Sequence, residues 1–188
     1  LYGWIRRHLL GRGGLVPYEE LNRVAAGAPV GSDGLLVLPF GNGAERTLAN
    51  RNIGAQLHGL DFNRHSLPHL LRAAQEGIVF ALRYGLEIMQ GMGVELRTVR
   101  AGHANMFLSP LFAEAFATVS GARLELFSTD GAQGAARGAG VGAGVYGTPG
   151  ESFHGLDMVS AVEPNRDLAD PYTEAYRRWE SALMKALG

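Results

Sequence analysis

The chain has 188 residues, a length that suits one domain. Apolar residues make up 46% and charged residues 19%, so the chain can bury a core and its composition does not favour disorder. A formal net charge of −1 gives no basic excess for nucleic acid or an anionic membrane, and the lack of cysteine excludes disulfides and thiolate metal sites. We therefore expect a globular, cytoplasmic protein without nucleic-acid or membrane partners.

The first third of the chain alternates between helical and extended patterns. Helical spacing of apolar residues predicts a helix over 1–10, and Pro17 opens a second helix that ends at Gly27. The continuous apolar run at 35–40 is typical of a buried strand, and 53–62 is predicted as another strand.

The clearest helix of the sequence begins after Ser66, which can cap it, and carries Pro68 harmlessly in its first turn. Gly77 and Gly85 share one face of this helix. Each interior glycine costs about 1 kcal/mol relative to alanine, so two on one face predict that another backbone approaches closely there.

The rest of the chain continues the alternation of strands and helices. This order predicts an α/β fold with at least partly parallel strand pairing. The elements expected are a strand (94–100), a helix from Ser109 to Gly121, a strand (122–128), a loop (148–169) and a helix (171–187).

A stretch rich in glycine and alanine, residues 131–147, allows three interpretations. Gly142, Gly144 and Gly147 match the GxGxxG dinucleotide fingerprint, but that fingerprint needs a strand just before it and a helix that opens within it. A flexible linker would be richer in serine. We favour a buried helix of small residues that Asp130 caps and that packs closely against a neighbour.

The order of several segments resembles the C-terminal, nucleotide-binding half of the FGGY carbohydrate kinases. Each match is weak alone, but their order and spacing together are fairly specific, and the resemblance runs from about Trp4 to Tyr146. The matching segments are LLVLPFGNGAERT (35–47), the strand and helix at 53–83, the loop and helix at 100–121, and DGAQGAARGAGVGAG (130–144).

The resemblance implies an RNase H-like, actin-like ATPase lobe, with a mixed sheet flanked by helices and ATP bound in a cleft. Residues 1–188 would form one partial C-terminal domain. The sugar-binding lobe, the first strands and the catalytic Asp that serves as base would all precede Leu1, so no catalytic residue is expected in this chain, which alone would be inactive.

The function that the resemblance implies is ATP-dependent phosphorylation of a sugar hydroxyl, with xylulose converted to xylulose 5-phosphate. ATP and Mg²⁺ would be the cofactors, and the partners would be the N-terminal sugar-binding lobe of the same polypeptide and the sugar. Pairing through the lobes, common in the family, favours a homodimer. The alternative is a catalytically silent or regulatory relative, because Arg100 and Ala101 stand where the family usually has glycines.

The nucleotide is expected between two loops. Small residues after the strand at 94–100 let adenosine approach the backbone, and the Asn105 amide can bond ribose or adenine, or merely cap the next turn. The start of the glycine-rich helix would form the opposite wall. The predicted contacts are Ala101, Gly102, Ala104, Asn105, Asp130 and Gly131. The histidines lack the spacing of a zinc motif, so no protein metal site is expected.

Overall fold

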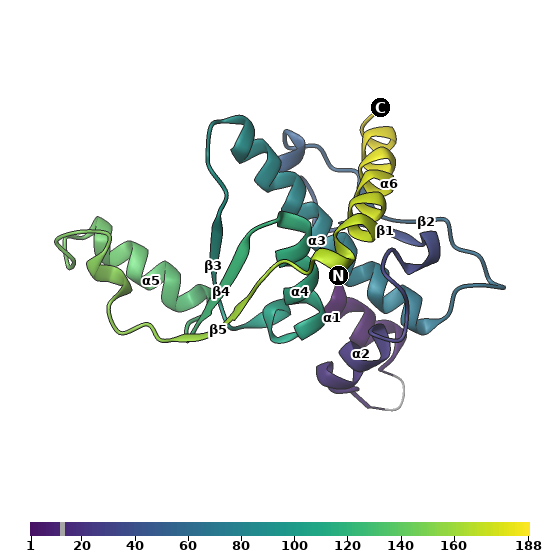
Figure 1. The fold of residues 1–188 in the computed structure, drawn as a ribbon, viewed down its shortest axis with the longest axis horizontal. Coiled ribbons are helices and arrows are strands. Elements are labelled where there is room, and N and C mark those ends of the chain that lie inside the picture. Colours follow the sequence, from purple (N-terminus) through teal and green to yellow (C-terminus); the bar gives the residue numbers. More distant parts are fainter. Residues whose placement is uncertain (12–13) are drawn as a thin grey trace.

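A mixed three-stranded sheet lies at the centre of the chain (Figure 1). The computed structural model describes residues 1–11 and 14–188. The sheet has the order β3 (Thr98–Gly102), β4 (Arg123–Phe127), β5 (Met158–Val162), in which β3 and β4 are parallel and β5 is antiparallel to β4. Parallel neighbours need a crossover connection, and the helix between β3 and β4 provides it. The predicted α/β class with partly parallel pairing is therefore confirmed.

A second, antiparallel sheet pairs β1 (Leu36–Phe40) with β2 (Gly54–His58). β1 is buried along most of its length, as its continuous apolar sequence predicts. β2 ends earlier than the predicted strand, because Gly59, at a φ of +72°, turns the chain away from the sheet.

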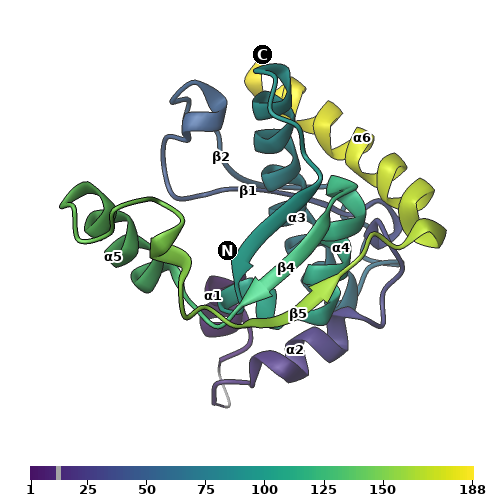
Figure 2. The same cartoon turned by 60° about the vertical axis from the view of Figure 1, so that its left-hand side comes forward.

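The helices gather mainly beside these two sheets. α3 packs on β1 and on α4, and α4 also contacts β4, whereas α5 extends away from the rest of the molecule (Figures 1 and 2). The α-helices are α1 (Tyr2–Trp4), α2 (Tyr18–Ala25), α3 (Leu67–Gly91), α4 (Pro110–Ser120), α5 (Gly131–Gly142) and α6 (Ala169–Leu187). The shorter turns are a π-helical turn (Ile5–Leu9) and 3₁₀ turns at Ser32–Gly34, Arg46–Leu48, Asn105–Leu108 (η4), Glu151–Phe153 (η5) and Arg166–Leu168.

The local signals at helix ends act as predicted. Ser66 and His69 form a reciprocal capping box at the start of α3, where His69 Nδ1 accepts from the Ser66 amide at 3.2 Å. At α4 the Ser109 hydroxyl accepts from the Phe112 amide, and Gly121 ends the helix at a φ of +67°.

Gly77 is the point where α3 touches the backbone of β1. A Cβ atom added at Gly77 would lie 2.2 Å from the carbonyl oxygen of Val37. At Gly85 the nearest atom would be Thr47 Cγ2 at 3.5 Å, an ordinary contact with a side chain. The predicted close approach of a backbone is confirmed at Gly77 and is wrong at Gly85.

Replacing Gly77 with alanine should therefore destabilise the protein although alanine is the better helix former. Overpacking typically costs about 1–3 kcal/mol, which exceeds the gain of about 1 kcal/mol in helix propensity. We expect a lower midpoint of thermal unfolding for Gly77→Ala and an unchanged or higher midpoint for the matched Gly85→Ala. Equal midpoints for the two variants would contradict the contact with Val37.

α6 is anchored to the core by one large side chain. Trp179 is fully buried, and its indole N–H donates to the carbonyl of Val37 at 2.9 Å. The ring packs against Phe40 and Phe80 with centroids 6.1 and 6.0 Å away. Burial of such an aromatic surface contributes strongly to stability, so α6 belongs to the core that carries β1.

A buried ion pair lies within α3, and its arginine also links this helix to α6. Arg72 Nε lies 2.8 Å from Glu76 Oε1, and both side chains are almost completely buried. Arg72 further donates to the carbonyl of Ala28 at 2.8 Å and to the hydroxyl of Tyr172, in α6, at 3.0 Å. Among the described residues, every buried side-chain nitrogen or oxygen atom has a hydrogen-bond partner. Buried charges are tolerated in proteins under this condition.

Glu76 in turn holds the turn that precedes β1. Its carboxylate accepts from the Gly31 amide at 3.1 Å and from the Ser32 hydroxyl at 3.4 Å. Ser32 and Asp33 have φ values of +48° and +52°, a region that costs non-glycine residues free energy. The buried Glu76 carboxylate therefore stabilises a turn whose backbone conformation is unfavourable for Ser32 and Asp33.

The glycine-rich stretch is helical, but its predicted burial is wrong. α5 covers Gly131–Gly142, so it ends five residues before the end of the predicted stretch, and it begins where the Asp130 carboxylate accepts from the Gln133 amide at 2.8 Å. None of its residues, all of which the structure describes, is buried. A Cβ at Gly134, Gly138 or Gly142 would meet nothing within 4 Å, so these glycines do not mediate close packing.

β5 is an element that the sequence pattern did not indicate. It falls inside the segment predicted as a loop, and Leu126 pairs with Ser160 in its register with β4. Most of its residues are exposed, so the strand lacks the apolar alternation that marks a half-buried strand.

Within residues 1–11 and 14–188, no helix has the length and apolar character that crossing a bilayer requires.

Candidate nucleotide site

The end of β3 touches the start of α5, and this junction forms the site. A Cβ atom added at Gly102 would lie 2.4 Å from the carbonyl oxygen of Thr129 and 3.3 Å from Asp130 Cα. Beyond Gly102, the His103 amide donates to the carbonyl of Phe127 at 2.8 Å. Only glycine permits this approach, so Gly102 joins two loops that lie far apart in the sequence.

All the predicted contact residues line one pocket at this junction, with a volume of about 290 Å³. Ala101 and Gly102 come from β3, and Ala104 and Asn105 from the loop that leads into η4. Asp130 and Gly131 form the opposite wall at the start of α5. The structure thus brings together the residues that the sequence places in two separate segments.

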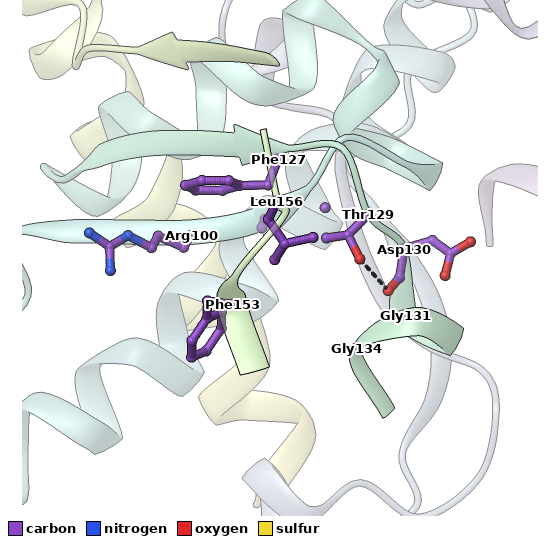
Figure 3. A pocket seen from close by; sticks show the side chains of 10 residues that line it. Arg100, Phe127, Thr129, Asp130, Gly131, Gly134, Phe153 and Leu156 are labelled. Carbon is purple, nitrogen blue, oxygen red and sulfur yellow. Dashed lines mark hydrogen bonds between the residues drawn. The ribbon is translucent and has the colours of Figure 1, made fainter. Parts of the chain in front are cut away.

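A second pocket of about 470 Å³ lies at the same junction (Figure 3). It shares Ala101, Gly102, Asp130 and Gly131 with the first pocket. In Figure 3, the rings of Phe127 and Phe153 lie apart from each other, Leu156 lies between them and next to Thr129, and Asp130 lies beyond Thr129. Volumes of about 300–1,000 Å³ with apolar walls and a few polar groups are typical of small-molecule sites.

Asn105 adopts a left-handed backbone conformation. Its φ is +53°, a left-handed value that asparagine tolerates better than most residues. It is exposed, and its side-chain amide makes no hydrogen bond to any residue that the structure describes. Ala104 occupies the cap position of η4, so the capping alternative for the Asn105 side chain is not what the structure shows.

Arg100 points along the outer face of the sheet. Its Nε lies 3.0 Å from Glu125 Oε2 on the neighbouring strand, and its side chain is 72% exposed. Arg100, followed by Arg123, lowers the pKa of Glu125, so this carboxylate is ionised at neutral pH. Arg100 borders the second pocket with its side chain, while the close contact between backbones falls at Gly102.

The competing interpretations of the glycine-rich stretch are wrong for this fold. Gly142 is the last residue of α5, and Gly144 follows at a φ of +71°, so a helix ends within the GxGxxG pattern instead of opening there. The helical state of α5 also excludes a flexible linker. Among the described residues, no group of three or more His, Asp or Glu side chains could hold a metal ion.

The three large apolar residues that line the second pocket were not predicted as contacts from the sequence. Phe127 lies near the end of the predicted strand 122–128, in which buried and less buried residues alternate, so its outward side chain could have been inferred. Phe153 and Leu156 lie in the segment predicted as a loop, and only their apolar character in a polar stretch gave a signal. Their position depends on the non-local pairing of β5 with β4.

Residues 1–145 match the model of the C-terminal domain of the FGGY family of carbohydrate kinases. Among curated proteins, a xylulose kinase of Haemophilus influenzae is 31% identical over 177 residues, which cover 89% of this chain and 34% of that protein. An L-xylulose/3-keto-L-gulonate kinase of Escherichia coli is 29% identical over 93% of this chain and 35% of its own length. The chain therefore spans about a third of the length of these relatives.

Solved structures show the same fold. The xylulose kinase of Rhodospirillum rubrum superposes with a TM-score of 0.80 at 22% identity, over 98% of this chain and 37% of that one. The glycerol kinase of Plasmodium falciparum, solved with ADP, gives 0.73 at 18% identity over 99% of this chain and 36% of the other. The expected actin-like α/β fold is thus confirmed, and the chain belongs to the FGGY family of carbohydrate kinases, whose C-terminal domain it matches.

Proposed function

We propose that this chain is the nucleotide-binding part of an ATP-dependent carbohydrate kinase. The observation that carries the proposal is the single pocket lined by Ala101, Gly102, Ala104, Asn105, Asp130 and Gly131. A nucleotide needs small residues where its adenosine meets the backbone and a polar group for the ribose or base. Gly102 and the unpaired amide of Asn105 are suited to these two tasks.

The chain's residues would contribute binding and orientation. In phosphoryl transfer, positioning and charge stabilisation matter more than covalent chemistry from the protein. ATP would supply the phosphoryl group, and Mg²⁺ would neutralise its phosphates. The carboxylate nearest the pockets, Asp130, already accepts from the Gln133 amide, so we assign the metal to the phosphates and not to a cage of side chains.

The sugar and the base that accepts its proton belong, in this proposal, to an N-terminal lobe of the same polypeptide. The support is the length of the relatives, of which this chain covers about a third. Xylulose is the proposed substrate, because relatives that align over most of the chain are named as kinases of xylulose or L-xylulose. A cytoplasmic location completes the proposal, since ATP-dependent sugar phosphorylation draws on the cytoplasmic nucleotide pool. A homodimer is proposed only because pairing through the lobes is common in the family that the chain resembles.

The test is turnover by the full polypeptide with ATP, Mg²⁺ and a panel of xylulose, L-xylulose, gluconate and glycerol. We expect kcat/KM for xylulose to exceed that for the other acceptors by at least tenfold. A preference for gluconate would overturn the choice of sugar but keep the kinase. The alternative of a catalytically silent relative predicts ATP binding without turnover of any acceptor.

A further inference from the structure

A buried glutamine of α3, Gln75, makes side-chain hydrogen bonds to three other segments of the chain. Its Oε1 accepts from the Ser109 hydroxyl at 3.1 Å, and its Nε2 donates to the Tyr2 hydroxyl at 2.9 Å and to Asn22 Oδ1 at 3.1 Å. These partners belong to α1, to α2 and to the residue just before α4. Gln75 is 1% exposed, whereas glutamine is mostly exposed in proteins, so its burial is unusual.

Ser109 stands where the η4 turn ends and α4 begins. Its hydroxyl oxygen accepts from the Phe112 amide at 3.3 Å, and its single hydroxyl proton goes to Gln75. The Ser109 amide donates to the carbonyl of Met106 at 3.0 Å, which ties the same residue to η4. Ser109 is therefore held by α3 through its side chain and holds η4 through its backbone.

Asn105 lies between two anchored points of the chain. On one side, the Ala104 amide donates to the carbonyl of Gly102 at 2.8 Å. On the other side, η4 ends at Ser109. The φ of +53° at Asn105 costs a non-glycine residue free energy, so the surrounding structure must maintain it. The position of the Asn105 amide therefore depends on Ser109 as well as on the junction of β3 with α5.

The apolar contacts of η4 do not replace this anchor. Phe107 packs edge-to-face on two rings of α4, with centroids 5.3 and 5.5 Å away, so this contact joins η4 only to the helix that follows it. Met106 packs against the apolar cluster formed by α1, α2 and α3, but a methionine side chain adapts to shifts of its neighbours. The hydrogen bond from Ser109 to Gln75 is directional, so it fixes an orientation that such packing leaves adjustable.

We infer that Gln75 is a positioning residue of the proposed nucleotide site: it orients Ser109, and through Ser109 it sets the place of the η4 turn from which the Asn105 amide meets the nucleotide. The inference rests on the proposed nucleotide-binding function. Gln75 itself lines neither pocket at the junction of β3 with α5, so it acts by holding Asn105 in its binding position and not by contact with the ligand.

The test compares variants of the full polypeptide by calorimetry with a non-hydrolysable ATP analogue and Mg²⁺, and by steady-state kinetics. Gln75→Met keeps the length of the side chain and removes its hydrogen bonds. We expect it to raise Kd for the analogue and KM for ATP about fivefold, the effect of losing one hydrogen bond to the ligand. The values of kcat and of KM for the sugar should not change, because only binding of the nucleotide is affected.

Three further variants separate positioning from stability. In Gln75→Glu, burial favours the protonated acid, which can accept from Ser109 and donate to Tyr2 as the amide does, so Kd should stay within about twofold of the wild type. Ser109→Ala breaks the same hydrogen bond from its other end and should raise Kd about fivefold. Gly77→Ala is the matched control on α3, because the expected clash is with Val37 of β1: it should lower the melting temperature and leave Kd unchanged.

The possible outcomes separate the two proposals. If the wild type binds no nucleotide, the proposed function is overturned and the inference falls with it. If the wild type binds and Gln75→Met binds equally well, the positioning role is overturned and nucleotide binding stands. If Gln75→Met does not fold, unchanged binding in Ser109→Ala overturns the role and a fivefold loss supports it. Equal losses in Gln75→Met and Gly77→Ala, or a loss that Gln75→Glu does not restore, would show a general effect on stability and would also overturn the inference.

Discussion

Replacing Arg72 with methionine is expected to destabilise the protein by about 3–5 kcal/mol, because the change leaves the Glu76 carboxylate buried without its partner. Three hydrogen-bonded contacts of Arg72 disappear together: those to Glu76, to the carbonyl of Ala28 and to Tyr172. The turn before β1 should loosen as well, since Glu76 also holds Gly31 and Ser32. Denaturant unfolding of the full polypeptide measures the loss.

The double variant Arg72→Met with Glu76→Leu is the control. Removing both charges should cost less than removing Arg72 alone, because no buried charge remains unpaired. A double variant that is less stable than Arg72→Met would show that the unpaired Glu76 carboxylate is not the cause of the lost stability.

The same single variant should show a characteristic dependence on pH. Burial raises the pKa of Glu76, and loss of Arg72 removes the interactions that oppose this rise. A raised pKa in the folded state means that the neutral acid is favoured by folding. The loss of stability of Arg72→Met relative to the wild type should therefore be smallest below the ordinary pKa of about 4.3 and grow as the pH rises through the raised value. A loss relative to the wild type that does not change with pH would contradict this prediction.

Replacing Gly102 with valine is expected to weaken nucleotide binding by at least tenfold and to lower stability by about 2 kcal/mol. The new Cβ would stand 2.4 Å from the carbonyl oxygen of Thr129, so the end of β3 and the start of α5 must separate. Both pockets include Gly102 and Asp130, and both would therefore change shape. Calorimetry with an ATP analogue and a melting curve measure the two effects.

Gly138→Ala is the matched control for Gly102→Val. Gly138 lies in α5 with nothing within 4 Å of an added Cβ, so alanine there should leave binding unchanged and favour the helix by about 1 kcal/mol. Weak binding in both variants would point to α5 as a whole and would contradict the specific contact at Gly102. Unchanged affinity in Gly102→Val would contradict the junction itself.

Local signals predicted most of the fold. Ser66, Ser109 and Asp130 each begin a helix, since their side chains satisfy amide groups that the first helical turn leaves free. The buried strand at the apolar run of β1 was also predicted, and so was partly parallel strand pairing, which β3 and β4 show. These features depend on a few neighbouring residues or on chain order, which a sequence displays directly.

Features that depend on distant segments were the ones missed. β5 exists because it pairs with β4, and its own residues are too exposed to signal a strand. The burial of α5 was inferred from its small residues, but glycines permit close packing without requiring it. Which of Gly77 and Gly85 faces a backbone likewise depends on where β1 lies.

The candidate site was predicted in part for the same reason. The two loops and their six residues were predicted from the sequence because they resemble a family in which the loops are ordered in this way. The aromatic residues of the second pocket, Phe127 and Phe153, were not predicted, since the position of Phe153 depends on the path of residues 147–157. Arg100 stands where the family usually has a glycine, but this difference leaves the junction of β3 with α5 intact. The two backbones approach each other closely at Gly102 and not at Arg100.

The most direct test of the account is to locate the nucleotide on the full polypeptide by photoaffinity labelling with 8-azido-ATP, tryptic digestion and mass spectrometry. Cleavage after Arg100, Arg123, Arg137 and Arg166 gives separate peptides 101–123, 124–137 and 138–166, which carry the η4 loop, the start of α5 and residues 147–157. We predict labelling on these peptides that excess ATP abolishes. Labelling confined to other peptides, or labelling that ATP does not compete away, would contradict a nucleotide site at the junction of β3 with α5.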